Sequence, residues 1–145
     1  MADVVLLDTT VASLLHPKKK KSRERALYEP HMKGKNLALC FQSVAELYEW
    51  AENNNWDEPK RQGLDAFIRR FLVIPYDYEL AKAWAVVMSA SRKEGRRFTA
   101  GDCWIAATAV HRELPLLTHD SDFVGRSIPG LNVISGLEQS KADAE

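Results

Sequence analysis

The sequence predicts a three-layer α/β fold, in which helices flank a mostly parallel central sheet of about five strands. Short continuous apolar runs recur along the chain, and such runs are typical of strands that are buried on both faces. Segments with helical periodicity lie between these runs, and the alternation of strands with helices favours a parallel sheet. The chain has no internal repeat and no linker, and its only low-complexity segment is a run of lysines.

Five apolar runs are the expected strands. The first of them ends directly at Asp8, which places a carboxylate at the end of a buried strand. In chain order the expected strands are Val4–Leu7, Leu37–Phe41, Leu72–Pro75, Leu114–Thr118 and Leu131–Ile134.

Four segments between the strands have the periodicity of helices. Apolar residues recur in them at positions i, i+3, i+4 and i+7, which gives each helix one apolar face. The last segment is apolar nearly all round, so we expect it to be the most central. The expected helices are Ser43–Asn53, Glu58–Leu72, Tyr78–Lys93 and Asp102–Glu113.

The length of 145 residues predicts one domain. We expect this domain at residues 1–137 and a polar, flexible tail at 138–145. With 46% apolar and 28% charged residues, the composition is that of an ordinary globular protein. No apolar run approaches the ~18 residues of a membrane-spanning helix, and the first apolar run is too short for a signal peptide. We therefore expect a cytoplasmic protein without a membrane partner, with Cys40 and Cys103 as buried free thiols.

Charge is balanced overall but unevenly distributed. The 20 basic and 20 acidic side chains cancel, which argues against a general nucleic-acid coat protein. Between His16 and Lys35, however, eight basic residues face two acidic ones, and the segment Arg92–Arg97 has four basic residues and one acidic residue. Basic patches beside an acidic centre suit a polyanionic substrate. Solvated helix faces are the alternative for either run.

Carboxylates occur where the predicted fold brings strand ends and helix starts together. Asp8 follows the first strand, and Asp120 follows the fourth, with Asp122 two residues later; Glu46 and Asp102 stand at the starts of two helices. In an open parallel sheet, ligands collect at the carboxyl ends of the strands. We therefore expect four acids, Asp8, Glu46, Asp102 and Asp120, to converge there from distant parts of the chain.

Each of these acids also has a purely structural interpretation. Asp8 and Asp120 can each be a helix N-cap, and Ser43 and Thr99 are each followed three residues later by an acid, as in a capping box. Because Ser43 and Thr99 already supply capping oxygens, the acids that follow them are available for another role. No lysine or arginine adjoins the four acids in sequence to neutralise them.

Converging carboxylates need compensation. Two carboxylates about 4 Å apart repel by roughly 4 kcal/mol at an effective dielectric near 20, so four of them raise their own pKa values or bind a cation. Carboxylate oxygens suit Mg²⁺ or Mn²⁺, and the sequence has no Cys/His set for zinc. One ion, or a pair that clamps the attacking and leaving oxygens of a phosphodiester, are both compatible with the residues.

Four motifs carry a resemblance to a known family. They are Asp8-Thr9-Thr10 after the first strand, Ser43-Val44-Ala45-Glu46-Leu47, Asp102-Cys103-Trp104-Ile105-Ala106-Ala107-Thr108-Ala109, and Thr118-His119-Asp120-Ser121-Asp122-Phe123. Their order and spacing resemble those of PIN-domain ribonucleases, and most closely the VapC toxins of prokaryotic type II toxin–antitoxin systems. The resemblance runs from Val4 to Ile134, nearly the whole chain.

The resemblance implies an Mg²⁺- or Mn²⁺-dependent endoribonuclease with a PIN-like fold. Matched one by one, Asp8, Glu46, Asp102 and Asp120 fall at the acids of the family's metal site. Asp122 matches an accessory acid of that site, and Thr10 matches a position that orients a carboxylate. We expect Thr118 to orient a carboxylate as well. Asp120 stands where many relatives have Asn, so the charge of this site can differ from theirs.

The resemblance also implies partners. These are an RNA substrate, a small cognate antitoxin that blocks the site, and a second copy of the chain. The apolar faces of Glu58–Leu72 and of Tyr78–Met88 are both candidates for the homodimer contact. The expected RNA phosphate contacts are Arg92, Lys93, Arg96 and Arg97 just before Asp102, and Lys18, Lys19, Lys20 and Lys21, which are not part of a family motif.

Other interpretations remain open at this stage. A PIN-fold nuclease can process RNA outside a toxin–antitoxin pair, and a PIN fold can bind RNA or a partner without cleaving it, although four intact acids weigh against the latter. A phospho-accepting receiver-like domain would need a lysine after the fourth strand, where this chain has none. His119 is either a proton shuttle or an ordinary histidine. The tryptophans, Trp50 among them, can stack RNA bases or belong to the core.

Overall fold

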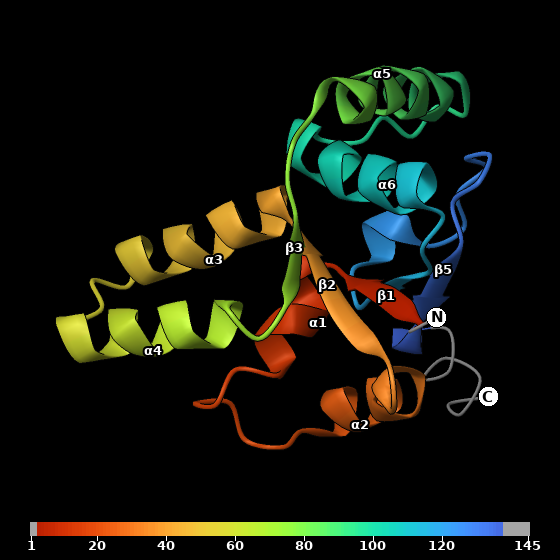
Figure 1. The fold of residues 1–145 in the computed structure, drawn as a ribbon. Coiled ribbons are helices and arrows are strands. Elements are labelled where there is room, and N and C mark those ends of the chain that lie inside the picture. The colour runs from red at the N-terminus through yellow and green to blue at the C-terminus, as the bar shows by residue number, and fades with distance from the viewer. Residues whose placement is uncertain (1–2, 138–145) are drawn as a thin grey trace.

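The computed structural model describes residues 3–137 and has a central sheet of five strands. The strand order is β3-β2-β1-β4-β5, and every neighbouring pair is parallel (Figure 1). The strands are β1 Val4–Leu7, β2 Asn36–Cys40, β3 Leu72–Ile74, β4 Leu116–Thr118 and β5 Val133–Ser135. The predicted fold class and all five strands are therefore confirmed, with ends that differ by one or two residues.

Helices cover both faces of the sheet and complete the three layers (Figure 1). Because side chains alternate along a strand, Leu6 of β1 packs with α5 and α6, whereas Val5 and Leu7 pack with α1 to α4. The helices are α1 Thr9–Leu14, α2 Arg23–Met32, α3 Phe41–Asn53, α4 Glu58–Ile68, α5 Tyr78–Lys93 and α6 Ala100–Arg112, with a short 3₁₀ helix, η1, at Ser121–Phe123.

The four predicted helices are confirmed, although α4 ends at Ile68, four residues before the predicted Leu72, and two helices were not predicted. α1 has only six residues, too few to show a periodic pattern. α2 contains Pro30 and buries a single residue, Tyr28, so it lacks the apolar stripe by which the other helices were recognised. The basic stretch between His16 and Lys35 thus consists largely of a loop and of α2.

One local prediction is wrong. α3 begins at Phe41, with Cys40 as its N-cap, whose Sγ accepts a hydrogen bond from the Gln42 N–H, so Ser43 lies inside the helix and is fully buried. Ser43 and Glu46 therefore form no capping box. The second expected cap is confirmed, because the Thr99 side chain accepts a hydrogen bond from the backbone N–H of Asp102 at the start of α6.

The remaining structural expectations concern cysteines, the membrane and the tail. Cys40 and Cys103 are free and buried, as predicted. Within residues 3–137, no helix combines the length and the apolarity that a bilayer crossing needs. The polar tail expected at 138–145 lies outside the described residues, and its flexibility stays a prediction.

Candidate metal centre

The chain places Asp8 in a buried, fully hydrogen-bonded position where β1 ends. Its side chain is only 2% exposed. One carboxylate oxygen accepts hydrogen bonds from the Thr10 hydroxyl at 2.5 Å and the Val11 N–H at 3.0 Å, and the other accepts from the Thr118 hydroxyl at 2.5 Å. Burial raises the pKa of Asp8, while these three hydrogen bonds oppose the rise. Asp8 is thus a helix cap, as its structural interpretation required, and also a carboxyl group held in place at the sheet edge.

Three other acids form a close cluster at the same edge. Asp102 comes from the first turn of α6, Asp120 is the N-cap of η1, and Asp122 lies inside η1. One oxygen from each of them lies within 4.8 Å of the others. The sequence ranked Asp122 as accessory, whereas the structure makes it a full member of the cluster.

The effect of this crowding is clearest in the pKa of Asp102. Burial, followed by the nearby charge of Asp120 and then by those of Glu46 and Asp122, raises the pKa of Asp102 to about 6. The charge of Asp120 also raises the pKa of Asp8. The five acids therefore influence one another, although only Asp102, Asp120 and Asp122 meet the 4.8 Å spacing within the described residues.

Glu46 is fixed beside the cluster by Thr9. The Thr9 hydroxyl lies 2.9 Å from a Glu46 carboxylate oxygen and 3.0 Å from the Ser43 hydroxyl. These contacts link the first turn of α1 to α3, and they explain why a serine at position 43 is buried. Thr9 was part of a motif in the sequence, but nothing in the pattern indicated that its hydroxyl contacts Glu46.

No basic side chain neutralises these acids in the part of the chain that the structure describes. Its five ion pairs all lie elsewhere, and none involves Asp8, Glu46, Asp102, Asp120 or Asp122. An all-oxygen donor set with uncompensated charge and one strongly raised pKa fits a hard divalent cation such as Mg²⁺ or Mn²⁺. The residues present therefore fit the ion that the sequence predicted.

Threonines connect Asp8 to the end of β4. Thr10 accepts a hydrogen bond from the His119 N–H at 3.0 Å while donating to Asp8. Thr118 accepts from the Asp120 N–H at 3.0 Å while donating to the other oxygen of Asp8. Both contacts agree with the orienting role expected for these two threonines.

Tyr28 was not identified from the sequence, yet it contacts Thr118 and His119 beside the candidate metal centre. Tyr28 of α2 is buried, and its hydroxyl lies 2.7 Å from the Thr118 carbonyl oxygen and 2.7 Å from Nδ1 of His119. The same oxygen accepts from the Gly136 N–H at 2.9 Å. Tyr28 therefore joins α2 to the ends of both β4 and β5. The only sequence signal for it was a lone aromatic residue in a charged stretch.

The basic residues before Asp102 differ in their surroundings. Arg96 donates to the carbonyl oxygens of Val124, Gly125 and Ser121, at 2.7, 3.4 and 3.0 Å. It therefore supports the loop that carries the acids of η1, and its expected contact with RNA phosphate stays a prediction. Lys93 lines a groove that contains none of the five acids, while Arg92 and Arg97 are exposed.

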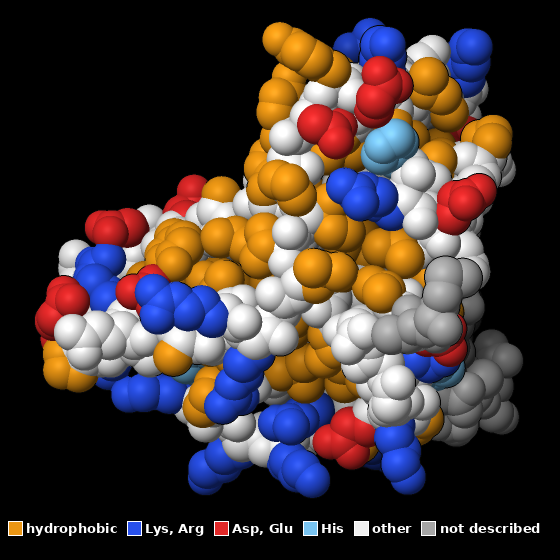
Figure 2. Space-filling view, viewed as in Figure 1, with side chains coloured by type: hydrophobic (Ala, Val, Ile, Leu, Met, Phe, Trp, Pro, Cys, Tyr) orange, Lys and Arg blue, Asp and Glu red, His pale blue; other side chains and the backbone are white. Residues whose placement is uncertain are grey.

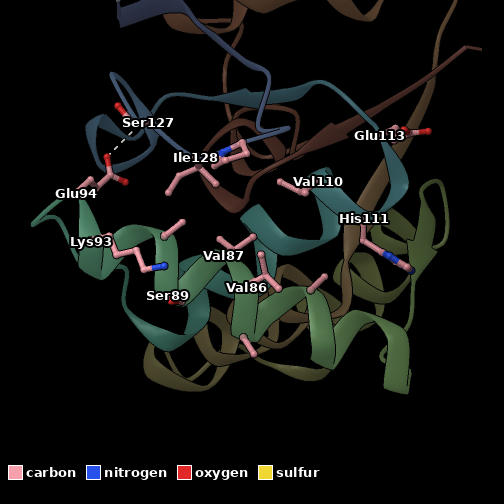
Figure 3. Close-up of a pocket in the computed structure, with 14 residues that line it drawn as sticks. Val86, Val87, Ser89, Lys93, Glu94, Val110, His111, Glu113, Ser127 and Ile128 are labelled. Atoms are coloured by element: carbon pink, nitrogen blue, oxygen red, sulfur yellow. Dashed lines mark hydrogen bonds between the residues drawn. The ribbon is translucent and has the colours of Figure 1, made fainter.

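That groove is a second feature of the surface. It has a volume of about 1100 Å³ and lies between α5, α6 and the loop at residues 127–129 (Figure 3). Its lining is mainly apolar, with Val86 and Val87 from α5, Val110 from α6 and Ile128 from the loop. The lysine run at residues 18–21 lies nearer to the acids than this groove does, because Lys19 lines a smaller hollow together with Glu46.

The fold and the cluster define an α/β protein with acids gathered at the carboxyl edge of a parallel sheet. A family model for the PIN domain matches residues 5–126. The chain therefore belongs to the PIN domain family, as the sequence motifs predicted.

Individual relatives agree with this family. Ribonuclease VapC5 of Mycobacterium tuberculosis is 42% identical over 50 residues, which are 34% of this chain and 37% of that protein. The match thus spans well under half of the relative's length. VapBC2 from Rickettsia felis, solved bound to a promoter DNA fragment, has a TM-score of 0.75 at 20% identity and covers 91% of this chain and 98% of the matched chain.

A third relative adds a named system. VapBC-5 from Mycobacterium tuberculosis, described as a member of the VapBC family of toxin–antitoxin systems, has a TM-score of 0.64 at 25% identity. It covers 91% of this chain and 98% of the matched chain. Both solved structures share the fold described above over nearly the whole chain.

The raised pKa of Asp102 predicts how metal-free stability depends on pH. Because the folded-state pKa of about 6 exceeds the unfolded value near 3.9, the folded protein binds more protons between these values. Ionisation of Asp102 therefore destabilises the protein as the pH rises from about 4 to about 6. We expect D102N in EDTA to melt above the wild type, with a difference that grows over this range and is constant above it. A difference independent of pH, measured by thermal melts, would contradict the assignment.

Removal of the Tyr28 hydroxyl tests its role beneath the site. In Y28F the Gly136 N–H and the Thr118 carbonyl lose a buried partner, which costs about 1–3 kcal/mol of unfolding free energy. Urea denaturation measures this loss. Y48F is the matched control, because the Tyr48 hydroxyl also makes a hydrogen bond, to Asp65, but at an exposed position. Equal losses of unfolding free energy in Y28F and Y48F would show that the buried hydrogen bonds of Tyr28 stabilise the protein no more than an exposed one does.

Proposed function

We propose that the protein is a divalent-metal-dependent endoribonuclease that hydrolyses RNA phosphodiesters and acts as the toxin of a type II toxin–antitoxin pair. The single observation that carries this proposal is the cluster of Asp102, Asp120 and Asp122, which has no basic partner among the described residues. The similarity to Ribonuclease VapC5 and to VapBC-5 supports the activity and the biological context.

The residues that would hold the metal are Asp102, Asp120 and Asp122, with Asp8 and Glu46 completing the acidic edge. When bound, Mg²⁺ or Mn²⁺ lowers the pKa of a coordinated water and stabilises negative charge on the scissile phosphate. This chemistry requires no side-chain base. We therefore assign no catalytic role to His119, whose Nδ1 already forms a hydrogen bond with the Tyr28 hydroxyl.

The other residues of the site fix the acids in place. Thr10 and Thr118 orient the two oxygens of Asp8, Thr9 orients Glu46, and Arg96 supports the loop at η1. Electrostatic stabilisation depends on charges that do not reorganise during the reaction. In this chain, hydrogen bonds rather than ion pairs supply that order, so the negative charge stays available to a cation.

Substrate binding is assigned to the basic loop between α1 and α2. Lys18, Lys19 and Lys20 are exposed there, and Lys21 follows them. Figure 2 shows Lys and Arg side chains gathered over α2 and the loop before it. Because Lys19 shares a hollow with Glu46, this loop can place phosphates beside the acids. Arg92 and Arg97 remain weaker candidates for the same role.

Cleavage of labelled RNA tests the enzymatic part of the proposal. We expect cleavage with Mg²⁺ or Mn²⁺, none with EDTA, and a loss of about 100-fold or more in D8N, D102N and E46Q. E49Q is the matched control, because Glu49 is an exposed acid on the same helix as Glu46. Cleavage that persists in EDTA, or equal loss in E46Q and E49Q, would refute the metal centre.

Growth on induced expression tests the biological part. A toxin should arrest growth in its active form and not as D102N, and co-expression of its antitoxin should restore growth. Metal-dependent cleavage without growth arrest would instead favour an RNA-processing nuclease outside a toxin–antitoxin pair.

The apolar surfaces offer places for the two proposed protein partners. Figure 2 shows apolar side chains gathered in the hollow between the α3–α4 pair and the α5–α6 pair. Leu72 and Val73 are exposed apolar residues of β3, which is an edge strand of the sheet. Contiguous apolar surface of this kind commonly marks a protein interface, and we assign this hollow to the antitoxin.

For the homodimer, we propose the groove between α5 and α6. Of the two faces that the sequence suggested, the one on Tyr78–Met88 borders this groove of about 1100 Å³. Val86, at its rim, is 69% exposed, which is unusual for a branched apolar residue and favours burial against a second copy.

A charge placed at Val86 tests this assignment. We expect V86E to shift the protein from dimer to monomer in light scattering, with the circular dichroism spectrum of the wild type because position 86 is exposed within the protomer. V73E is the matched control, since Val73 is an exposed apolar residue on the β3 edge and does not line the groove. Dissociation by V73E alone would move the interface to that edge.

A further inference from the structure

A small hollow opens between α1 and α3, directly beside the acidic edge. Its volume is about 290 Å³, and it shares Glu46 with the candidate metal centre and Thr10 with the hydrogen-bonded surroundings of Asp8. Small-molecule pockets span roughly 300–1,000 Å³, so this hollow lies at the lower limit and suits a single flat ring system. The proposed function uses Glu46 and the basic loop but assigns no ligand to the hollow itself.

One wall of the hollow is an indole that is braced from outside. The ring of Trp50 packs against Trp56 at 4.8 Å and against the buried His16 at 5.6 Å, measured between ring centroids. His16 in turn packs against Phe67 at 5.1 Å. An aromatic ring held in this way is a platform on which a nucleobase can stack, since every base presents a π-face.

A cation lies at the same wall. The ammonium group of Lys19 is 5.6 Å from the centroid of the Trp50 ring, and Lys19 also lines the hollow. In single-stranded nucleic acid a phosphate is always adjacent to the stacked base. Lys19 is therefore placed to exchange its contact with the indole for one with that phosphate.

The polar edge of the hollow presents mainly acceptors. The Ser13 hydroxyl donates its proton to the Thr10 carbonyl at 2.8 Å, and the Thr9 hydroxyl directs its proton towards Glu46 or Ser43. Both hydroxyl oxygens therefore retain lone pairs only, and the carboxylate oxygens of Glu46 accept as well. Such an edge pairs with N–H donors. The exocyclic amino groups of adenine, cytosine and guanine each carry two N–H donors, whereas uracil has only its single N3–H, which lies between two carbonyl acceptors.

We propose that this hollow binds one unpaired, amino-bearing nucleobase of the RNA substrate, stacked on Trp50 with Lys19 on its phosphate. The proposal rests on the ribonuclease function and names the substrate feature that positions RNA at the acids. The base must be unpaired, because base pairing would use the same amino group and because sequence-specific proteins read RNA chiefly at splayed, single-stranded bases.

Binding measured without cleavage tests the stacking wall. The probes are labelled ten-nucleotide oligo(A), oligo(C) and oligo(U), with fluorescence anisotropy recorded in EDTA. We expect the wild type to prefer oligo(A) and oligo(C) to oligo(U), and W50L to weaken oligo(A) binding about tenfold and to erase the preference. W50F, which keeps an aromatic ring, should retain most of the affinity and covers the case that W50L does not fold.

W84L is the matched control. Trp84 is half-buried like Trp50, but it packs against Trp104 and does not line the hollow. W84L should therefore lower the melting temperature as W50L does and leave RNA binding within about twofold. For the cation, K19Q should reduce the slope of log affinity against log salt by about 0.7, whereas K60Q, at an exposed position on α4, should not.

The outcomes separate this inference from the proposed function. Equal effects of W50L and W84L on RNA binding, or an affinity for oligo(U) equal to that for oligo(A) in the wild type, overturn the base site even if RNA is cleaved with Mg²⁺. The expected binding pattern without any metal-dependent cleavage supports the base site as an RNA contact and refutes the ribonuclease. Absence of binding to all three oligonucleotides overturns the base site outright.

Discussion

The organising constraint of this molecule is like-charge crowding at the carboxyl edge of the sheet. Asp102, Asp120 and Asp122 lie close together, and Asp8 and Glu46 are near enough to be coupled to them. Nothing in the described chain balances this charge with a basic group. A fold under selection for stability alone would separate the acids or pair them, so their arrangement indicates a site that is completed by a cation.

The surrounding polar groups are arranged to permit this crowding. Asp8 is buried yet accepts three hydrogen bonds, two from threonine hydroxyls and one from a backbone N–H. Each threonine also accepts a backbone N–H bond from the residues that follow β4, Thr10 from His119 and Thr118 from Asp120. The threonine side chains thus link the end of β1 to the end of β4. Neutral donors of this kind fix the position of a carboxylate without cancelling its charge. Structural capping and functional placement are therefore two aspects of the same contacts.

The sequence predicted the sheet because its strands are continuous apolar runs, and it placed Asp102 and Asp120 together because parallel strands end at one edge, whereas Asp8 and Glu46 lie outside the close cluster. It failed where no periodic signal exists. α2 has almost no apolar stripe, so Tyr28 and its contacts to β4 and β5 remained hidden. We predicted that Arg96 contacts phosphate because its charge can be read from the sequence. Its hydrogen bonds to the carbonyl oxygens of Val124 and Ser121 join distant parts of the chain, and no sequence pattern indicates them.

The acids belong to different layers of the fold. Asp102 lies on α6, which packs on one face of the sheet, while Glu46 lies on α3, most of whose buried residues pack on the other face. Their separation is therefore set by how α3 and α6 pack against each other and against the sheet, unlike the fixed spacing of residues on one helix. Remodelling a buried aliphatic side chain, far from any charge, would alter the coordination geometry offered to an ion. In this protein, the packing of the hydrophobic interior therefore determines the distances between the acids of the candidate metal centre.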